Sequence, residues 1–267
     1  DYLLRDSYFT GASYGEFDLT RILRVIRPTE NGIAFKESGM HAVEDYVLSR
    51  YQMYMQVYFH PASRSMEVLL QNLLNRAKLL YTSEQDFFAR TSPRLLPFFE
   101  HRIRLTDYLA FDDGVMNTYF QSWIDGPDRI LSDLAERYIN RKVFKSITFK
   151  SNQENQLDIL RSIVAEVGFD PEYYTAIHHN FDLPYDIYRP NAEKKRTQIE
   201  IYRKDESLVE LSTLSPIVHS LSGTIHGDSR FYFPKEMLVD TGIFAEQNAT
   251  FLSYIHNDHF NIGDLSS

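Results

Sequence analysis

The chain has 267 residues, of which 43% are hydrophobic, so it can bury a sizeable core and is not a disordered protein. Its formal net charge of −9 argues against a broad basic surface for nucleic acid, so local clusters of Arg and Lys must meet any anionic ligand. The absence of cysteine excludes disulfides, thiolate metal ligands and thiol nucleophiles, and it fits a cytoplasmic protein. No apolar run reaches the roughly 20 residues that span a bilayer, so we expect a soluble protein that does not enter the membrane.

Helical spacing begins at the first residues of the chain. The residues that recur at intervals of three or four, which is the spacing of one helix face, are Tyr2, Arg5, Asp6 and Phe9. A native chain rarely begins inside a helix. We therefore interpret Asp1 as the start of a truncated or proteolysed product whose missing N-terminal part packed against this one.

Two long helices are predicted next. Residues 39–59 carry apolar and aromatic side chains on all sides, which is typical of a largely buried helix. Pro61 breaks or kinks this helix, because proline lacks the N–H that a helix interior needs. A second, amphipathic helix follows, and its apolar stripe consists of Met66, Leu69, Leu70, Leu73, Leu74, Ala77 and Leu80.

More helix starts are predicted at Asp112 and Asp113 and at Pro127, where proline suits the first turn of a helix. Residues 1–142 are therefore predicted to form a mainly α-helical domain.

The residue pattern of the sequence changes after residue 142, from helical spacing to short segments typical of strands. A helix near residues 153–167, which Gly168 can end, lies among short segments rich in β-branched and aromatic residues. These segments, which we predict to be strands, are 143–149, 197–203 and 229–233. We predict that residues 143–267 form an α+β lobe with a small antiparallel sheet.

Nine histidines raise the question of a metal site, but the sequence contains neither an HExxH motif nor a His-Asp pair. The adjacent His178 and His179 would point to opposite sides of a strand, which favours a partly exposed strand over a shared metal. The basic run at residues 194–196 is more typical of a solvated loop than of a phosphate site. A metal role is also disfavoured near the C-terminus, at His256, Asp258 and His259.

A candidate ligand site lies within the helix predicted at residues 39–59. Arg50, Tyr54 and Tyr58 share one helix face and span about 12 Å, roughly the length of a sugar with its triphosphate. A guanidinium suits bidentate phosphate binding, and an aromatic ring suits packing on a sugar. From spacing alone, however, a buried arginine paired to an acid and two core tyrosines is the favoured alternative.

Tyr2 and Asp6 form a second candidate pair, because they share a face of the opening helix. A carboxylate that only accepts hydrogen bonds, next to an aromatic ring, suits a sugar hydroxyl. An ordinary helix in which Asp6 pairs with an arginine is the alternative that spacing alone favours.

Four motifs that follow one another along the chain favour the ligand-site interpretation over the ordinary one. They are DYLLRD, GEFDLTRILR, SRYQMYMQVYFH and ERYINRKVFKSI. Together they resemble the HD-superfamily deoxynucleoside triphosphate triphosphohydrolases, which include the eukaryotic SAM-and-HD-domain nucleotidase and bacterial dGTP-activated enzymes. The resemblance covers residues 1–150 well and the rest in outline. It implies part of an HD-type helical core, and the hydrolysis of deoxynucleoside triphosphates (dNTPs) to deoxynucleoside and triphosphate.

The resemblance also implies a divalent metal, such as Mg²⁺ or Mn²⁺, in the full-length protein. In that family a His, a His-Asp pair and a later Asp hold the metal, and the later Asp stands three residues before the DY of the first motif. All four ligands, and a histidine thought to assist proton transfer, would therefore precede Asp1. We expect no catalytic residue and no metal ligand in this chain, which should be inactive by itself.

By the same resemblance, Tyr2 packs near the substrate sugar and Asp6 accepts a hydrogen bond from its 3′-hydroxyl. Arg50 binds the triphosphate. Tyr58 leaves no room for a 2′-hydroxyl, which implies a preference for deoxyribonucleotides. Phe59 replaces a glutamine of the eukaryotic members, so contacts to the edge of the base are in doubt at that position.

Members of the family are activated by nucleotides, such as dGTP or GTP, that bind between the subunits of a homotetramer. Asp18 and Arg21 match residues that meet the effector base, and Lys36 matches a phosphate contact. Arg141 and Lys145 match a basic pair that reaches a neighbouring effector. The resemblance thus implies effector sites at these five residues.

Ser38 and Pro61 stand where eukaryotic relatives have lysines, so one effector pocket would be weaker or differently selective. Two other functions stay open. The chain could be a non-catalytic nucleotide-binding or assembly module that regulates a partner, or part of an HD phosphohydrolase that acts on other nucleotides, for which Tyr58 is the discriminating residue.

Overall fold

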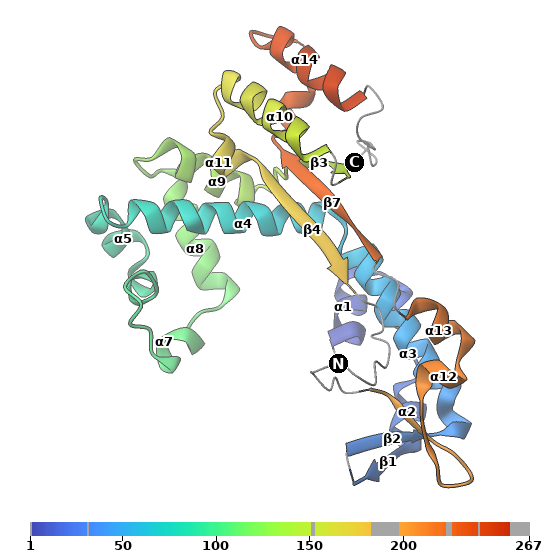
Figure 1. Ribbon diagram of the computed structural model, residues 1–267. Helices are drawn as coiled ribbons and strands as arrows, with labels where there is room; N and C mark the ends of the chain where they lie inside the picture. The colour runs from blue at the N-terminus through green and yellow to red at the C-terminus, as the bar shows by residue number, and fades with distance from the viewer. Residues whose placement is uncertain are drawn as a thin grey trace. The chain divides into compact units, whose positions relative to one another are not determined.

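The computed structural model describes residues 2–30, 32–150, 153–182, 198–222, 226–239 and 241–256, except for the side chains of residues 180–182 and 226–227. Packing divides the chain into two compact units (Figure 1). Unit 1 comprises Asp1–His60 and Asn180–Asp228, and unit 2 comprises Pro61–His179 and Ser229–Ser267. These units follow contacts within the fold, whereas the division after residue 142 concerns a family domain and stays a prediction.

In its described residues, unit 1 contains helices and a sheet of four short strands. Its helices are α1 (Tyr2–Thr10), α2 (Leu19–Val25), α3 (Met40–Met53), α12 (Leu211–Leu214) and α13 (Pro216–Leu221), with 3-10 turns at Ser13–Gly15 and Glu37–Gly39 and a π-helical turn at Tyr54–Tyr58. Its strands are β1 (Ile26–Thr29), β2 (Gly32–Lys36), β5 (Glu200–Tyr202) and β6 (Leu208–Glu210), in the order β1-β2-β5-β6.

The sheet of unit 1 is mixed, because β2 pairs parallel to β5 while β1–β2 and β5–β6 are antiparallel. Its β1–β2 hairpin lies inside the region predicted as mainly helical and was missed. The signal was present, since Asn-Gly at 31–32 is a dipeptide typical of tight hairpin turns. Gly32 has a φ of 140°, a value that a side chain disfavours.

Unit 2 contains most of the helices. These are α4 (Pro61–Leu80), α5 (Gln85–Thr91), α6 (Leu96–Phe99), α7 (Leu105–Leu109), α8 (Asp113–Ile124), α9 (Arg129–Ile139), α10 (Glu154–Glu166), α11 (Pro171–Tyr174) and α14 (Ala245–His256), with 3-10 turns at Pro93–Leu95 and Lys235–Leu238. The second sheet has the order β3-β7-β4, from β3 (Lys145–Phe149), β7 (His226–Phe233) and β4 (Ala176–Asp182).

The predicted apolar stripe of α4 is confirmed, because Leu69, Leu73 and Ala77 are fully buried and the rest of the stripe packs around them. Trp123 of α8 and Phe88 of α5 lie in the same core, 5.7 Å apart between ring centres. This core fixes α4, α8 and α9 against one another, as Figure 1 shows for the long α4 and its neighbours.

All three predicted strands are present, as β3, β5 and β7, but they do not share one sheet, because β5 lies in the sheet of β1, β2 and β6. β3 and β7 pair antiparallel, from Lys145 opposite Phe233 to Phe149 opposite Ser229. The predicted helix near residues 153–167 is α10, and it ends before Gly168, whose φ is 96°. The predicted class, mainly helical with an α+β portion, is confirmed. Within the described ranges, none of the helices combines the length and the apolar character that crossing a membrane requires.

Candidate functional site

The helix that carries Arg50, Tyr54 and Tyr58 changes its winding at the candidate site. α3 is regular up to Met53, and residues 54–58 then form a π-helical turn. The amide N–H of Phe59 accordingly donates to the carbonyl oxygen of Tyr54, five residues back, over 2.8 Å. Such turns occur frequently at functional sites. The sequence does not predict this change of winding.

The π-helical turn presents Tyr58 to α1. The Tyr58 hydroxyl donates a hydrogen bond of 2.7 Å to Oδ2 of Asp6, a residue 52 positions away in sequence. The other carboxylate oxygen of Asp6, Oδ1, accepts from Nε of Arg5 over 2.9 Å. Asp6 thus forms the ion pair with an arginine that the ordinary alternative anticipated, and it also contacts the predicted ligand site.

Arg50 lies beside aromatic rings. Its guanidinium carbon is 4.5 Å from the centre of the Tyr54 ring, and the guanidinium also donates a hydrogen bond to the Tyr2 hydroxyl. Stacking on an aromatic face and hydrogen bonding leave the planar group oriented, which suits recognition of an oxyanion. Arg50, Tyr54 and Tyr58 are all half-buried. They are therefore not the fully buried core residues of the alternative interpretation.

The rings of the site pack as one aromatic group. Tyr54 meets Tyr58 nearly edge to face, with 4.9 Å between ring centres, and it meets Phe59 at 5.7 Å. Tyr2 lies 6.3 Å from Tyr58. The structure therefore brings together all five residues predicted to contact a substrate: Tyr2, Asp6, Arg50, Tyr54 and Tyr58.

Electrostatics keep Asp6 ionised. The hydrogen bond from Tyr58, and after it the charge and hydrogen bond of Arg5, hold the pKa of Asp6 below its usual value despite some desolvation. Burial, followed by the hydrogen bond to Asp6, raises the pKa of Tyr58. Burial is also the largest cause that raises the pKa of Tyr2, against the lowering effect of Arg50. Near neutral pH the site thus presents an acceptor carboxylate and neutral phenols.

Sequence reasoning missed the residues that hold α1 against α3. A side chain at Gly15 would place its Cβ 2.6 Å from the carbonyl oxygen of Leu3 and 2.8 Å from Cβ of Ser7, so only glycine permits this approach. Ser49 of α3 donates a hydrogen bond of 3.0 Å to the carbonyl oxygen of Glu16. The clue in the sequence was the small size of Ser7, which follows the first motif, and of Gly15 and Ser49, which begin the second and third.

The residues present do not fit the metal that the resemblance implies. Among the residues that the structure describes, His, Asp and Glu side chains nowhere gather in a group of three or more that could hold a metal ion. His178 and His179 lie on β4, where Nδ1 of His179 is 2.8 Å from the Ser229 hydroxyl oxygen. The basic run at 194–196, Asp258 and His259 lie outside the described residues.

Three predicted effector residues of unit 1 lie around the start of α2 and the end of β2. Asp18 caps α2, because its carboxylate accepts from the amide N–H of Arg21 over 2.8 Å. Arg21 in turn donates to the carbonyl oxygen of Ser38 over 2.9 Å, close in sequence to the exposed Lys36. Asp18 and Arg21 therefore stabilise the local structure, in addition to the effector contact predicted for them.

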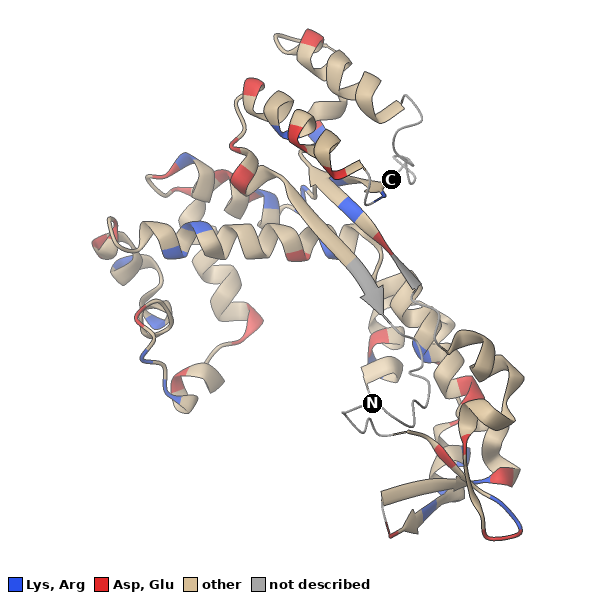
Figure 2. Cartoon of the chain, viewed as in Figure 1, with Lys and Arg blue, Asp and Glu red and all other residues tan. Residues whose placement is uncertain are grey.

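The other two, Arg141 and Lys145, belong to unit 2. Arg141 is exposed and follows α9 in a left-handed conformation, with a φ of 52°, and Lys145 begins β3. Figure 2 shows acidic and basic residues interspersed along the helices of this unit. Of the predicted basic pair, one residue thus lies on the connection between α9 and β3 and the other at the first position of β3.

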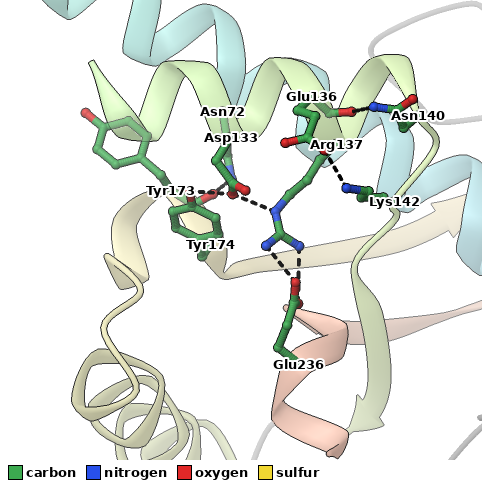
Figure 3. A network of polar contacts seen from close by, with 9 residues as sticks. All are labelled: Asn72, Asp133, Glu136, Arg137, Asn140, Lys142, Tyr173, Tyr174 and Glu236. Atoms are coloured by element: carbon green, nitrogen blue, oxygen red, sulfur yellow. Dashed lines mark hydrogen bonds and ion pairs between the residues drawn. The ribbon is translucent and has the colours of Figure 1, made fainter. Parts of the chain in front are cut away.

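A buried polar network fixes the end of α9 from which Arg141 follows (Figure 3). Arg137, whose side chain is only 6% exposed, donates to both carboxylate oxygens of Glu236 over 2.8 and 3.2 Å and to Asp133 over 2.6 Å. Tyr174 donates to the same Asp133 oxygen over 2.7 Å. This network was not predicted, because its members are far apart in sequence.

Comparisons with known proteins agree with the HD part of the resemblance. The family described as the HD associated region matches residues 17–91, which include α3 and the π-helical turn. The uncharacterized protein YwfO of Bacillus subtilis strain 168 is 48% identical over 241 residues, which cover 90% of this chain and 55% of YwfO. The chain thus spans about half the length of the curated relatives it matches.

Two solved structures share the fold. A phosphohydrolase from Bacteroides thetaiotaomicron aligns with a TM-score of 0.68 and 24% identity, covering 88% of this chain and 59% of that protein. A hypothetical protein from Aquifex aeolicus aligns with a TM-score of 0.59 and 24% identity, covering 94% of this chain and 56% of that one. Residues 17–91 thus match the HD associated region, and the chain shares its fold with these two proteins.

Proposed function

We propose that this chain is the nucleotide-binding part of an HD-type phosphohydrolase that cleaves dNTPs to deoxynucleoside and triphosphate. The observation that carries the proposal is the contact between Tyr58 and Asp6, because it joins the two separate predicted half-sites into one. The fold shared with a phosphohydrolase, the match to HD associated regions and the motif order of the sequence support the same function.

The sugar would lie against Asp6 and the aromatic group. Among the residues that the structure describes, each carboxylate oxygen of Asp6 has one hydrogen-bond donor and can accept a second, so the group can receive a sugar hydroxyl. The rings of Tyr2 and Tyr58 provide an apolar surface for the face of the sugar, and a ring at that surface excludes substituents that do not fit.

The triphosphate would lie against Arg50. A guanidinium has five N–H groups in a rigid fork, and its stacking on Tyr54 fixes the plane in which that fork lies. Near neutral pH the phenols of Tyr2 and Tyr58 beside this cation carry no charge. Arg50 therefore supplies orientation and charge for an anionic ligand.

The described residues offer no set of ligands for a divalent metal, so we derive no step through one. In the proposal, the metal and the attacking water are held by a segment of the full-length protein other than the described residues. This chain contributes binding and orientation, which by themselves can account for a large part of an enzymatic acceleration.

We also propose that the full-length protein is a homotetramer activated by a nucleotide such as dGTP or GTP. The effector would contact the residues that the resemblance indicates, which are Asp18, Arg21, Lys36, Arg141 and Lys145. The exposure of Lys36 and Arg141 supports this part of the proposal, since both can reach an anion from the surface.

The test uses the full-length protein with Mn²⁺ or Mg²⁺ and a panel of dNTPs, ribonucleoside triphosphates and dNDPs, with dGTP or GTP added as effector. We expect turnover of dNTPs, and a fall of about tenfold to a hundredfold in kcat/KM for Arg50→Met, which removes charge-assisted hydrogen bonds. Arg90→Met, at an exposed arginine of α5, is the matched control and should behave as the wild type. The absence of dNTP turnover, or an Arg50→Met variant as active as wild type, would refute the proposal.

A further inference from the structure

The hydroxyl of Tyr58 makes a hydrogen bond that the predicted role of its ring does not require. The resemblance concerns only the ring, which leaves no room for a 2′-hydroxyl. In the structure, the hydroxyl at the far end of that ring donates to Oδ2 of Asp6 over 2.7 Å. A phenylalanine ring would exclude a 2′-hydroxyl equally well. The hydroxyl of Tyr58 therefore has a separate function.

Asp6 needs to be held in place. It lies on the nine-residue helix α1, and its side chain is 25% exposed, so without partners the carboxylate could rotate toward water. Arg5 holds Oδ1, but the Arg5 side chain is itself 55% exposed and contributes little fixed geometry. The half-buried Tyr58 is therefore the firmer of the two partners.

Tyr58 is rigid because of its place in the chain. It closes the π-helical turn, its ring packs nearly edge to face on Tyr54 at 4.9 Å, and Tyr2 lies on it at 6.3 Å. The turn at Ser13–Gly15 links α1 to α3, because Gly15 packs closely on α1 and Ser49 of α3 donates a hydrogen bond to the carbonyl oxygen of the next residue, Glu16. A rigid donor thus meets a carboxylate on a rigidly placed helix.

We propose that the Tyr58 hydroxyl positions Asp6 so that the remaining lone pairs of this carboxylate accept the 3′-hydroxyl of the substrate sugar. Tyr58 then sets selectivity at two sugar carbons: at C2′ directly through its ring and at C3′ indirectly through Asp6. This inference rests on the proposed function and deepens it.

The opposite role has a distinct consequence. If the Tyr58 hydroxyl merely occupied a lone pair that the ligand needs, it would compete with the sugar, and its removal would strengthen recognition of the 3′-hydroxyl. A positioning hydroxyl predicts the reverse. The sign of the change therefore separates the two roles.

The experiment is Tyr58→Phe in the full-length protein, which keeps the ring and removes only the hydroxyl. The measured quantity is the ratio of kcat/KM for a dNTP to that for the matching 2′,3′-dideoxynucleotide, for each of the four bases. We expect this ratio to fall about three- to tenfold, the net worth of one hydrogen bond. The ratio for dNTP over ribonucleotide should stay unchanged, because the ring remains.

Tyr81→Phe is the matched control. The Tyr81 hydroxyl donates to a Glu100 carboxylate oxygen over 2.6 Å, so this variant deletes the same kind of hydrogen bond in unit 2. It should leave both ratios unchanged. Melting temperatures of both variants show whether either loses its fold.

A double-mutant cycle shows whether Tyr58 acts through Asp6. Once Asp6→Ala has removed the acceptor, adding Tyr58→Phe should change the 3′-hydroxyl ratio no further. Independent effects of the two changes, an unchanged ratio in Tyr58→Phe or a ratio that rises would overturn the inference while leaving the proposed function intact. A wild-type protein without dNTP turnover would instead refute the proposed function itself.

Discussion

The guanidinium carbon of Arg50 lies 4.5 Å from the centre of the Tyr54 ring, one helical turn further along the chain. The two residues are four positions apart, so they lie on one face of α3, which is regular up to Met53, just before the π-helical turn begins at Tyr54. The ring orients the cation, and this relationship has a measurable consequence.

Replacing Tyr54 by leucine removes the aromatic face while keeping an apolar side chain of moderate size. We expect KM for the dNTP to rise about threefold to tenfold, because a cation–π contact contributes roughly 0.5–2 kcal/mol to the orientation of Arg50. Tyr54→Phe retains the ring and should retain most of the affinity. Steady-state kinetics of the full-length protein measure both, and equal KM values for the leucine variant and wild type would contradict the role of Tyr54.

Truncation of Tyr58 to alanine should relax discrimination against ribonucleotides. The change opens space for a 2′-hydroxyl and loses the packing of the ring on the sugar, and steric exclusion of a close analogue corresponds to about 1–3 kcal/mol. The measurement is the ratio of kcat/KM for dGTP over GTP. An unchanged ratio would show that Tyr58 packs in the fold but does not select the sugar.

The sequence predicts the residues of the site better than their arrangement. Spacing on one helix face placed Arg50, Tyr54 and Tyr58 together, since a periodic pattern is a local property. The π-helical turn and the hydrogen bond from Tyr58 to Asp6 depend on contacts between segments 52 residues apart, which periodicity does not encode. The β1–β2 hairpin was missed because strongly helical segments on both sides outweighed its Asn-Gly signal.

Unit 2 illustrates the same limit. The amphipathic pattern of α4 was sufficient to predict its buried stripe, whereas the network around Arg137 joins α9 to residues about a hundred positions later. Its polar members look like ordinary surface residues in the sequence.

Glu236→Ala should destabilise the chain, because it leaves the guanidinium of Arg137 buried with only part of its hydrogen bonds. Glu236 is itself 48% exposed, which reduces the expected loss to about 1–3 kcal/mol in the free energy of unfolding. Lys142→Ala, which removes the exposed ion pair with Glu136, is the control and should change stability by about 0.5 kcal/mol or less. Urea unfolding measures both, and equal losses would contradict the importance of the network.

The ion pair between Arg76 and Asp128 predicts a dependence of stability on pH. Burial raises the pKa of Asp128, but hydrogen bonds and the charge of Arg76 outweigh it, so the pKa is lower folded than unfolded. The stabilisation is therefore complete above the unfolded value of about 3.9 and is lost as pH falls through the folded value.

Asp128→Asn tests this dependence, because asparagine can still cap α9 but carries no charge. We expect the variant to be less stable than wild type at pH 7 and the difference to shrink below about pH 4. Unfolding followed by circular dichroism from pH 3 to pH 7 gives both curves. A difference that stays constant over this range would show that the charge of Asp128 does not stabilise the fold.

Loss of Arg141 and Lys145 together should abolish nucleotide activation of the full-length protein. Each charge-assisted contact contributes about 1.5–3 kcal/mol, and both side chains lie where replacement by alanine spares the core. Activity against effector concentration, with light scattering to follow assembly, measures the effect. Unchanged activation and unchanged effector-dependent assembly would contradict the effector role but not the roles of Arg50 and Tyr58.

We propose that the full-length protein releases intact triphosphate from a deoxynucleotide. The most direct measurement is ³¹P NMR of the products formed from a dNTP by the full-length protein with diamagnetic Mg²⁺ and effector, compared with its Arg50→Met variant. We expect tripolyphosphate and deoxynucleoside in equal amounts, formed at a rate that falls in the variant. Pyrophosphate with deoxynucleoside monophosphate, or inorganic phosphate with deoxynucleoside diphosphate, would contradict the proposed reaction.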